Sequence, residues 1–166
     1  MALIFFISTT SLIFNNVKEI FMLEKGSSAP SFSVKDHNGN DVSLDDFKGK
    51  KVVIWFYPKA DTPGCTVEGK GFRDDYEKFI QKNIVILGVS LDNESDNKAF
   101  AEKFDFPYPL LCDVNQEIAQ AYEAVKGPED EYASRITYVI GEDGNILEAI
   151  SQVDTKTHSG DLCSSL

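Results

Sequence analysis

The chain has 166 residues, of which 42% are hydrophobic and 26% charged, a balance that predicts a single compact domain. Its formal net charge of −11 repels phosphate backbones and anionic lipid headgroups, so no nucleic acid or membrane partner is expected. Its three cysteines and two histidines are scattered, so the sequence predicts no disulfide framework, no metal site and no cofactor.

Residues 1–21 stand apart from the rest of the sequence. Apolar runs at 2–7 and 12–14 are separated by serines and threonines, and no basic residue precedes Lys18. A secretory signal needs a basic start and a small-residue cleavage site, and a membrane span needs a longer apolar run. We expect residues 1–21 to be an extension outside the fold and residues 22–166 to form the domain. A degenerate targeting segment and an ordered part of the domain are the alternatives.

A β-hairpin is predicted near the start of the domain. Residues 32–34 and 42–44 flank Asn38-Gly39, a dipeptide typical of tight turns between antiparallel strands. His37 lies inside this turn, and we expect it to be a surface residue rather than a catalytic base.

An apolar strand at 52–57 then runs through a short connection into a helix. Thr62 is placed to be the N-cap, with its side-chain oxygen accepting a backbone N–H, and Pro63 suits the first helical position. Cys65 falls at the third position, where unpaired N–H groups and the helix dipole favour thiolate over thiol. A reactive cysteine and a buried structural cysteine both fit this position on its own.

The helix after Cys65 has apolar residues at 72, 76, 79 and 80, a spacing that predicts one buried face. Gly69 and Gly71 interrupt its first part, each at a cost of about 1 kcal/mol relative to alanine. The turn that carries Cys65 is therefore predicted to loosen more easily than the rest, which would help to expose an oxidised sulfur to a reductant.

Strands and helices alternate from there to the end of the chain. Residues 84–91 form a nearly continuous apolar run, typical of a central strand covered on both faces. The remaining pattern predicts a helix over 93–104, a strand over 108–113, a helix over 116–125, a hairpin over 137–150 and a closing helix over 158–166. This order indicates an α/β fold whose central mixed sheet has helices on both faces.

The segment before the helix carries a recognisable motif. Pro58, Thr62 and Cys65 form the pattern Pro-x-x-x-Thr-x-x-Cys, and the similarity continues through residues 72–74. In this motif the sequence resembles the peroxiredoxins, specifically their Q-type branch, also called bacterioferritin comigratory protein. The resemblance extends from about Met22 to the C-terminal region, and it implies a thioredoxin-like fold.

The resemblance also implies a peroxidase mechanism. Cys65 would attack the O–O bond of a hydroperoxide and become a sulfenic acid, Thr62 would orient sulfur and peroxide, and Pro58 would shield the pocket from water. Arg135 matches the family arginine, whose guanidinium would stabilise the thiolate and the charge that develops on the leaving oxygen. Glu68 matches a glutamate that holds the arginine. A solvated charge at a strand end is the alternative for Arg135, and an acid favoured by the helix dipole is the alternative for Glu68.

The other two cysteines bear on how the enzyme would be recycled. Many Q-type relatives have a resolving cysteine just over one helical turn beyond the peroxidatic one, and here Lys70 stands at that position. Cys112 lies in an apolar strand and is expected to pack as a small hydrophobe. Cys163, near the C-terminus, is the candidate resolving residue. We favour a one-cysteine cycle over resolution by Cys163, with thioredoxin, glutaredoxin or a small thiol as the external reductant.

The sequence thus predicts a thiol-dependent peroxidase, expected to be a cytoplasmic monomer. A thioredoxin-like disulfide oxidoreductase is one alternative, but it lacks the Cys-x-x-Cys motif, because Thr62 and Glu68 stand three residues before and after Cys65. A non-enzymatic binding protein on the same fold is the other alternative. A binding protein would not need Pro58, Thr62, Cys65 and Arg135 together.

Overall fold

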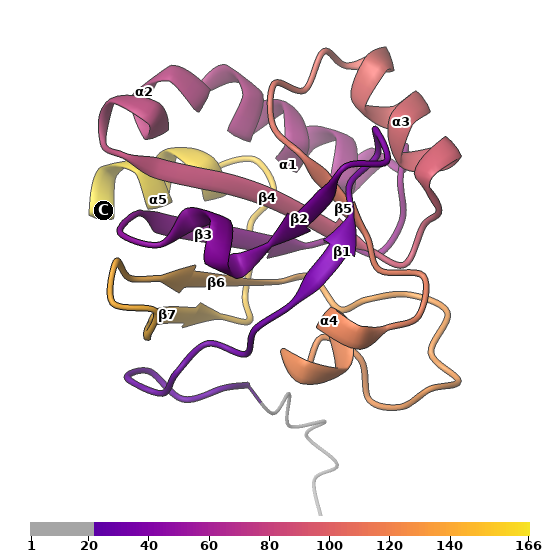
Figure 1. Ribbon diagram of the computed structural model, residues 1–166. Coiled ribbons are helices and arrows are strands. Elements are labelled where there is room, and N and C mark those ends of the chain that lie inside the picture. The colour runs from indigo at the N-terminus through magenta and orange to yellow at the C-terminus, as the bar shows by residue number, and fades with distance from the viewer. Residues whose placement is uncertain (1–21) are drawn as a thin grey trace, which may run out of the picture.

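Figure 1 shows the computed structural model, which describes residues 22–166; the extension expected at residues 1–21 lies outside the described residues. A five-stranded sheet has the order β5-β4-β3-β6-β7, and β1 and β2 form a separate two-stranded sheet. The strands are β1 (Ser33–Lys35), β2 (Asp41–Ser43), β3 (Lys51–Phe56), β4 (Ile84–Ser90), β5 (Leu110–Cys112), β6 (Ile136–Ile140) and β7 (Ile146–Ile150). The helices are α1 (Pro63–Asp74), α2 (Tyr76–Gln81), α3 (Glu94–Lys103), α4 (Glu117–Ala121) and α5 (His158–Ser165), with a short 3-10 helix η1 (Leu44–Phe47). None of the helices in this described part of the chain is long and apolar enough to cross a bilayer.

Strand β3 lies at the centre of the large sheet. It pairs in parallel with β4 and antiparallel with β6, while β5 and β7 form the edges. Residues 52–56 are all buried, as expected for an apolar strand that is covered on both faces. The predicted α/β fold with a mixed sheet is confirmed.

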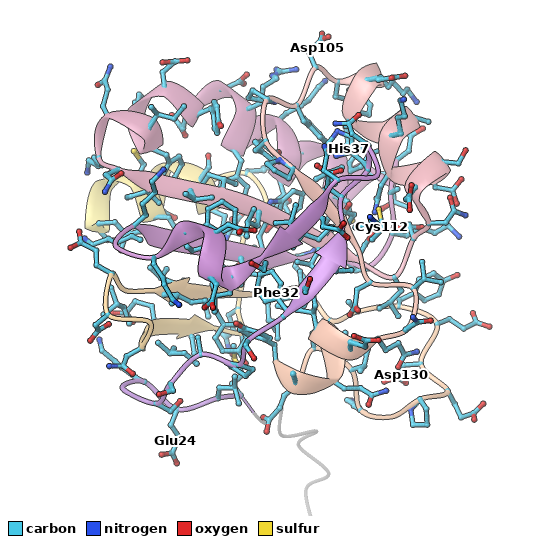
Figure 2. All side chains as sticks on the ribbon, in the orientation of Figure 1. Glu24, Phe32, His37, Asp105, Cys112 and Asp130 are labelled. Carbon is cyan, nitrogen blue, oxygen red and sulfur yellow. The ribbon has the colours of Figure 1, made fainter. Side chains whose placement is uncertain are left out.

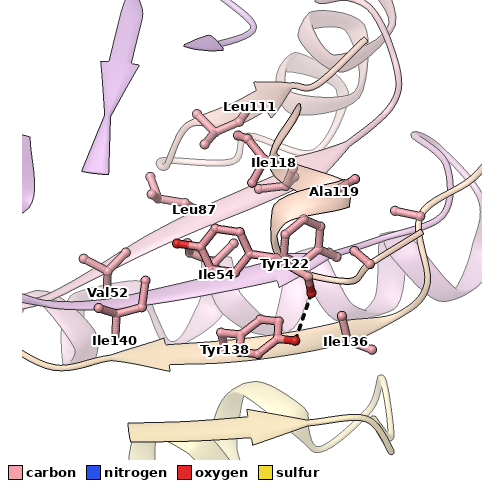
Figure 3. Packing of buried hydrophobic residues seen from close by; sticks show 14 of the residues in the cluster. Val52, Ile54, Leu87, Leu111, Ile118, Ala119, Tyr122, Ile136, Tyr138 and Ile140 are labelled. Atoms are coloured by element: carbon pink, nitrogen blue, oxygen red, sulfur yellow. Dashed lines mark hydrogen bonds between the residues drawn. The ribbon is translucent and has the colours of Figure 1, made fainter. Parts of the chain in front are cut away.

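Alternate residues of β3 divide the core into two layers. Residues 52, 54 and 56 face α4, the β1–β2 hairpin and η1, and Figure 3 shows part of this layer. There the Tyr138 hydroxyl donates a hydrogen bond to the backbone carbonyl of Tyr122 at 2.9 Å. Residues 53 and 55 face the other way, into a cluster with α1, α2, α3 and α5. This second layer also contains Cys65, so the candidate site is built against the core of the domain.

The helix that carries Cys65 is broken, which the sequence pattern did not predict. Asp75, at φ −94° and ψ 1°, separates α1 from α2. Phe72 and Phe79 are buried as predicted, but Ile80 is 49% exposed. A break interrupts the 3.6-residue period, so the apolar positions after Asp75 no longer continue the buried face of α1.

Helix α4 is shorter than the predicted helix over 116–125. Gln116, the N-cap residue, and Glu123, which follows the C-cap residue Tyr122, have left-handed backbone conformations with φ of 60° and 55°. Left-handed residues do not continue a right-handed helix, so only five residues remain in α4.

His37 is buried, contrary to the prediction of a surface turn residue. Its ring Nδ1 accepts a hydrogen bond from the backbone N–H of Leu110 at 3.0 Å, and the backbone N–H of His37 donates to the Leu110 carbonyl at 2.8 Å. Burial lowers the pKa of His37. The hairpin forms as predicted around Gly39, which has a φ of 81°, and His37 attaches its tip to β5 (Figure 2).

Candidate active site

Cys65 occupies the predicted position at the start of α1. It is the third residue of that helix, after Pro63 at the first position. The strand β3 and the connection over residues 57–62 bring the chain to the start of α1. The side chain of Cys65 has no exposed surface. The sulfur therefore lies in the interior, near the backbone N–H groups that a helix N-terminus leaves unpaired.

The Thr62 side chain does not cap α1 as predicted. Thr62 is the N-cap residue by backbone conformation, with φ −96° and ψ 156°, but it makes no side-chain capping bond. Its hydroxyl instead donates to the backbone carbonyl of Lys59 at 2.8 Å. Threonine hydroxyls compete in this way for local backbone groups. The bond stabilises the connection that precedes Cys65.

Pro58 is half-buried at the other end of that connection. It lines a surface pocket of about 370 Å³ together with Lys59 and Tyr132. Cys65 does not line this pocket. The structure thus places Pro58 at the rim of a surface pocket beside the connection that precedes Cys65.

Arg135 connects the start of β6 to α1. Its Nη1 donates to Oε2 of Glu68, and its Nη2 lies 3.4 Å from Sγ of Cys65. The Arg135 side chain is 23% exposed, whereas the Glu68 side chain is fully buried. A glycine at position 64 allows this approach, because a Cβ atom at Gly64 would lie 3.1 Å from Nη2. The structure therefore brings together three of the sequence-predicted site residues, which are separated by up to 70 positions in the chain.

The Glu68 carboxylate is only partly satisfied. Oε2 accepts from Arg135, but Oε1 is buried and has no hydrogen-bond partner among residues 22–166. Burial raises the pKa of Glu68 to about 7, although the charge and hydrogen bond of Arg135 act in the opposite direction. Glu68 lies beyond the first turn of α1, and its buried side chain is paired with Arg135.

Two further residues complete the cluster, and the sequence pattern did not single out either as a site residue. Nε2 of His158, the first residue of α5, lies 2.9 Å from Oγ1 of Thr137 and 3.9 Å from Oε1 of Glu68. Burial lowers the pKa of His158 to about 4, so its imidazole is neutral at neutral pH. Thr137 follows Arg135 by two residues. Residues two apart on a strand lie on the same face, so this spacing could have placed Thr137 beside Arg135. His158 had no local signal, because its position depends on how α5 docks.

Gly69 and Gly71 have a packing role in α1. A Cβ atom at Gly69 would lie 2.6 Å from Cζ of Phe106, and one at Gly71 would lie 2.9 Å from Oγ of Ser159. The sequence suggested instead that these glycines loosen the turn that carries Cys65. Alanine at either position would disturb packing as well as backbone flexibility, so such variants do not isolate the flexibility.

The structure places Cys112 and Cys163 in the interior as free thiols. Burial raises the pKa of Cys112 to about 11, in agreement with packing as a small hydrophobe. Cys163 lies within α5, and Nζ of Lys82 donates to its backbone carbonyl at 2.6 Å. Lys70 is half-buried, with Nζ 5.1 Å from the centre of the Phe104 ring. Across residues 22–166, no three metal-ligating side chains are grouped so that they could hold a metal ion.

Fold and site together define a class of protein. The sheet and helices form a thioredoxin-like fold of the peroxiredoxin type, and a single arginine-paired cysteine stands at the N-terminus of α1. The chain belongs to the AhpC/TSA family, whose model matches residues 25–149.

Comparison with individual relatives places the chain among peroxiredoxin Q and Bcp proteins. It is 42% identical over 124 residues to chloroplastic peroxiredoxin Q of Gentiana triflora, covering 75% of this chain and 57% of that protein. It is 38% identical over 141 residues to peroxiredoxin Bcp of Bacillus subtilis (strain 168), covering 82% of this chain and 90% of that protein. The chain thus spans little more than half the length of the plant relative and most of the bacterial one.

Solved structures agree with this placement. Peroxidoxin BcpB from Mycobacterium tuberculosis superposes with a TM-score of 0.80 at 29% identity, covering 86% of this chain and 96% of that one. A cysteine-to-serine mutant of Xylella fastidiosa PrxQ also gives a TM-score of 0.80, at 27% identity, covering 86% of this chain and 94% of that one.

Proposed function

We propose that this protein is a thiol-dependent peroxidase that reduces hydrogen peroxide and organic hydroperoxides at Cys65. The observation that carries the proposal is the 3.4 Å approach of the Arg135 guanidinium to the sulfur at a helix N-terminus. Membership of the AhpC/TSA family supports it. So does a Xanthomonas campestris bacterioferritin comigratory protein, 27% identical, whose structure was described with its alkyl peroxide reduction activity.

The proposed reaction is a two-electron transfer. The Cys65 thiolate attacks one oxygen of the peroxide, an S–O bond forms and the O–O bond breaks. The sulfur is oxidised to a sulfenic acid, and the leaving oxygen takes a proton from solvent to become water or an alcohol. Arg135 stabilises negative charge first on the sulfur and then on the leaving oxygen, and Glu68 holds Arg135 in place.

Access to the sulfur requires a local movement. Cys65 has no exposed surface, whereas the adjacent Arg135 side chain is 23% exposed. We therefore propose that a peroxide enters as Arg135 and the first turn of α1 shift outward. In the same movement the Thr62 hydroxyl would leave the Lys59 carbonyl and orient the peroxide, and Pro58 would limit the entry of water.

An external thiol is the proposed reductant of oxidised Cys65. Lys70 occupies the usual resolving position, and Cys163 is buried within α5, which favours a one-cysteine cycle served by thioredoxin, glutaredoxin or a small thiol. Non-reducing mass spectrometry after one equivalent of peroxide tests this cycle. A sulfenic or glutathione adduct on Cys65 supports it, and a linked Cys65–Cys163 peptide contradicts it.

The proposed location is the cytoplasm, and the proposed state is a monomer. The bacterial Bcp relatives support the first, while the chloroplastic plant relatives make targeting through residues 1–21 the alternative. Fractionation of cells that express the full chain, and light scattering on the purified protein, test these two proposals.

Peroxide consumption in the presence of a thioredoxin system tests the function. The native chain and a Cys112→Ser/Cys163→Ser variant are expected to consume peroxide at similar rates, and Cys65→Ser is expected to consume none. Activity that survives Cys65→Ser would reject the assignment. Reduction of insulin disulfides by the native chain without peroxide consumption would favour a thioredoxin-like oxidoreductase instead.

A further inference from the structure

A chain of polar contacts extends from the sulfur to the C-terminal helix. Arg135 lies between Sγ of Cys65 and Oε2 of Glu68. The second carboxylate oxygen, Oε1, faces Nε2 of His158 at 3.9 Å, and Thr137 contacts the same nitrogen at 2.9 Å. The side chains of Glu68 and His158 are almost entirely buried, so the contact between them lies away from bulk solvent.

We propose that His158 is a positioning residue for the reactive cysteine, which acts through the Glu68 carboxylate and the Arg135 guanidinium. The inference deepens the proposed function, because it rests on Cys65 as the reacting thiol. We assign the imidazole proton to Nε2, where it is directed between Oγ1 of Thr137 and Oε1 of Glu68.

Oε1 of Glu68, which lacks a hydrogen-bond donor among residues 22–166, is the reason for placing the imidazole proton on Nε2. A buried acceptor without a donor is costly, and the cost is greatest for a charged group. The N–H dipole of His158 is the contact that the structure offers to Oε1, and a shift of about 1 Å would turn it into a hydrogen bond. That contact favours the ionised form of Glu68, and the ionised carboxylate makes the charge-assisted hydrogen bond to Arg135.

The ring of His158 is well fixed for this role. It packs edge-on against the Phe72 ring, with 5.6 Å between ring centres, and Thr137 contacts its Nε2. Burial lowers the pKa of His158 to about 4, so the ring acts as a neutral dipole and adds no second positive charge beside Arg135. A neutral donor stabilises the carboxylate without competing with the guanidinium for it.

Other titratable groups also face this pair. Tyr108 approaches Glu68 from the segment before β5, and its hydroxyl donates to the Gly69 carbonyl at 2.7 Å. Asp161 acts on His158 from the same helix, and it raises the pKa of that histidine against the effect of burial. Burial holds the pKa of Tyr108 well above its ordinary value, so Tyr108 stays neutral throughout the range in which Glu68 titrates.

The test is the pH profile of Cys65 reactivity between about pH 5.5 and 8.5, the range that brackets the pKa of Glu68. All chains carry Cys112→Ser and Cys163→Ser, so that Cys65 is the one thiol. Two rate constants are measured: alkylation of Cys65 by iodoacetamide, and its oxidation by hydrogen peroxide. The variants are His158→Phe, which keeps a ring without a polar edge, His158→Gln, which restores a donor, and Glu68→Gln, which removes the titrating carboxylate.

In the parent chain, reactivity is expected to show an inflection that Glu68→Gln abolishes. His158→Phe is expected to move this inflection upward by about half a pH unit or more, because the carboxylate loses its facing dipole. At neutral pH the rate of Cys65 oxidation should fall accordingly, and His158→Gln should restore both values. A residue that only packs would change the unfolding midpoint without moving the inflection.

An unchanged inflection in folded His158→Phe overturns the proposal. If that variant does not fold, Thr137→Val decides, because it removes the hydroxyl that contacts Nε2 of His158 and keeps the imidazole itself. A shifted inflection in Thr137→Val supports the proposal, and an unshifted one rejects it. Alkylation requires no peroxide, so a chain that shows the shift but consumes no peroxide would contradict the proposed function and leave the role of His158 intact.

Discussion

Glu68 and His158 make opposing contributions to the pH dependence of the unfolding free energy. Burial raises the pKa of Glu68 from 4.5 to about 7, so its contribution to stability is complete below pH 4.5 and is lost as pH rises through 7. Burial lowers the pKa of His158 from 6.5 to about 4, so its contribution is complete above pH 6.5 and is lost as pH falls through 4. Between pH 4.5 and 6.5 the two effects on the unfolding free energy of the native chain therefore nearly cancel.

Single variants are expected to uncover each contribution separately. Between pH 5 and 7.5, Glu68→Gln should gain about 2 kcal/mol of stability as pH rises, because the titration of His158 remains. Over the same range His158→Phe should lose about 2 kcal/mol, because the titration of Glu68 remains. The double variant should follow the native chain.

Urea unfolding, monitored by the fluorescence of the buried Trp55, measures these free energies at each pH. Carboxylates elsewhere titrate alike in all four chains, so the difference between the two single variants isolates Glu68 and His158. The same sign of pH dependence in Glu68→Gln and His158→Phe would refute the reasoning, as would a flat profile in both.

Two further predictions concern α1 and its contacts. Arg135→Lys should slow Cys65 oxidation by about 100-fold in stopped-flow measurements, because an ammonium does not present the guanidinium fork; an unchanged rate constant would contradict this. Gly69→Ala should lower the unfolding free energy by about 1–3 kcal/mol, because its Cβ would lie 2.6 Å from Phe106. Gly160→Ala in α5 is the matched control, because no atom of residues 22–166 lies within 4 Å of its Cβ, and it should stabilise by up to about 1 kcal/mol. Equal effects of the two alanines in urea unfolding would reject the packing argument.

The parts of the structure that depend on local chemistry were predictable from the sequence. The strand that becomes β3 and the proline that opens α1 fixed the position of Cys65, because both signals come from neighbouring residues. The Asn38-Gly39 turn predicted the first hairpin for the same reason. The approach of Arg135 to Cys65 was predicted through the family resemblance, since neither segment by itself specifies the other.

The parts that depend on distant contacts were not predictable. His37 is buried because it bonds to Leu110, 73 residues away, and a turn motif carries no information on that partner. Glu68 and His158 meet only when α5 docks on α1. The Thr62 hydroxyl had two local partners available, the helix N–H groups and a preceding carbonyl, and the geometry of the connection selects the carbonyl.

The most direct test of the account is to locate the oxidised sulfur. The native chain is treated with one equivalent of hydrogen peroxide in the presence of dimedone, which labels sulfenic acids, and is analysed by peptide mass spectrometry. The label is expected on Cys65, with Cys112 and Cys163 unmodified. A label on Cys112 or Cys163 while Cys65 stays reduced would contradict the central claim.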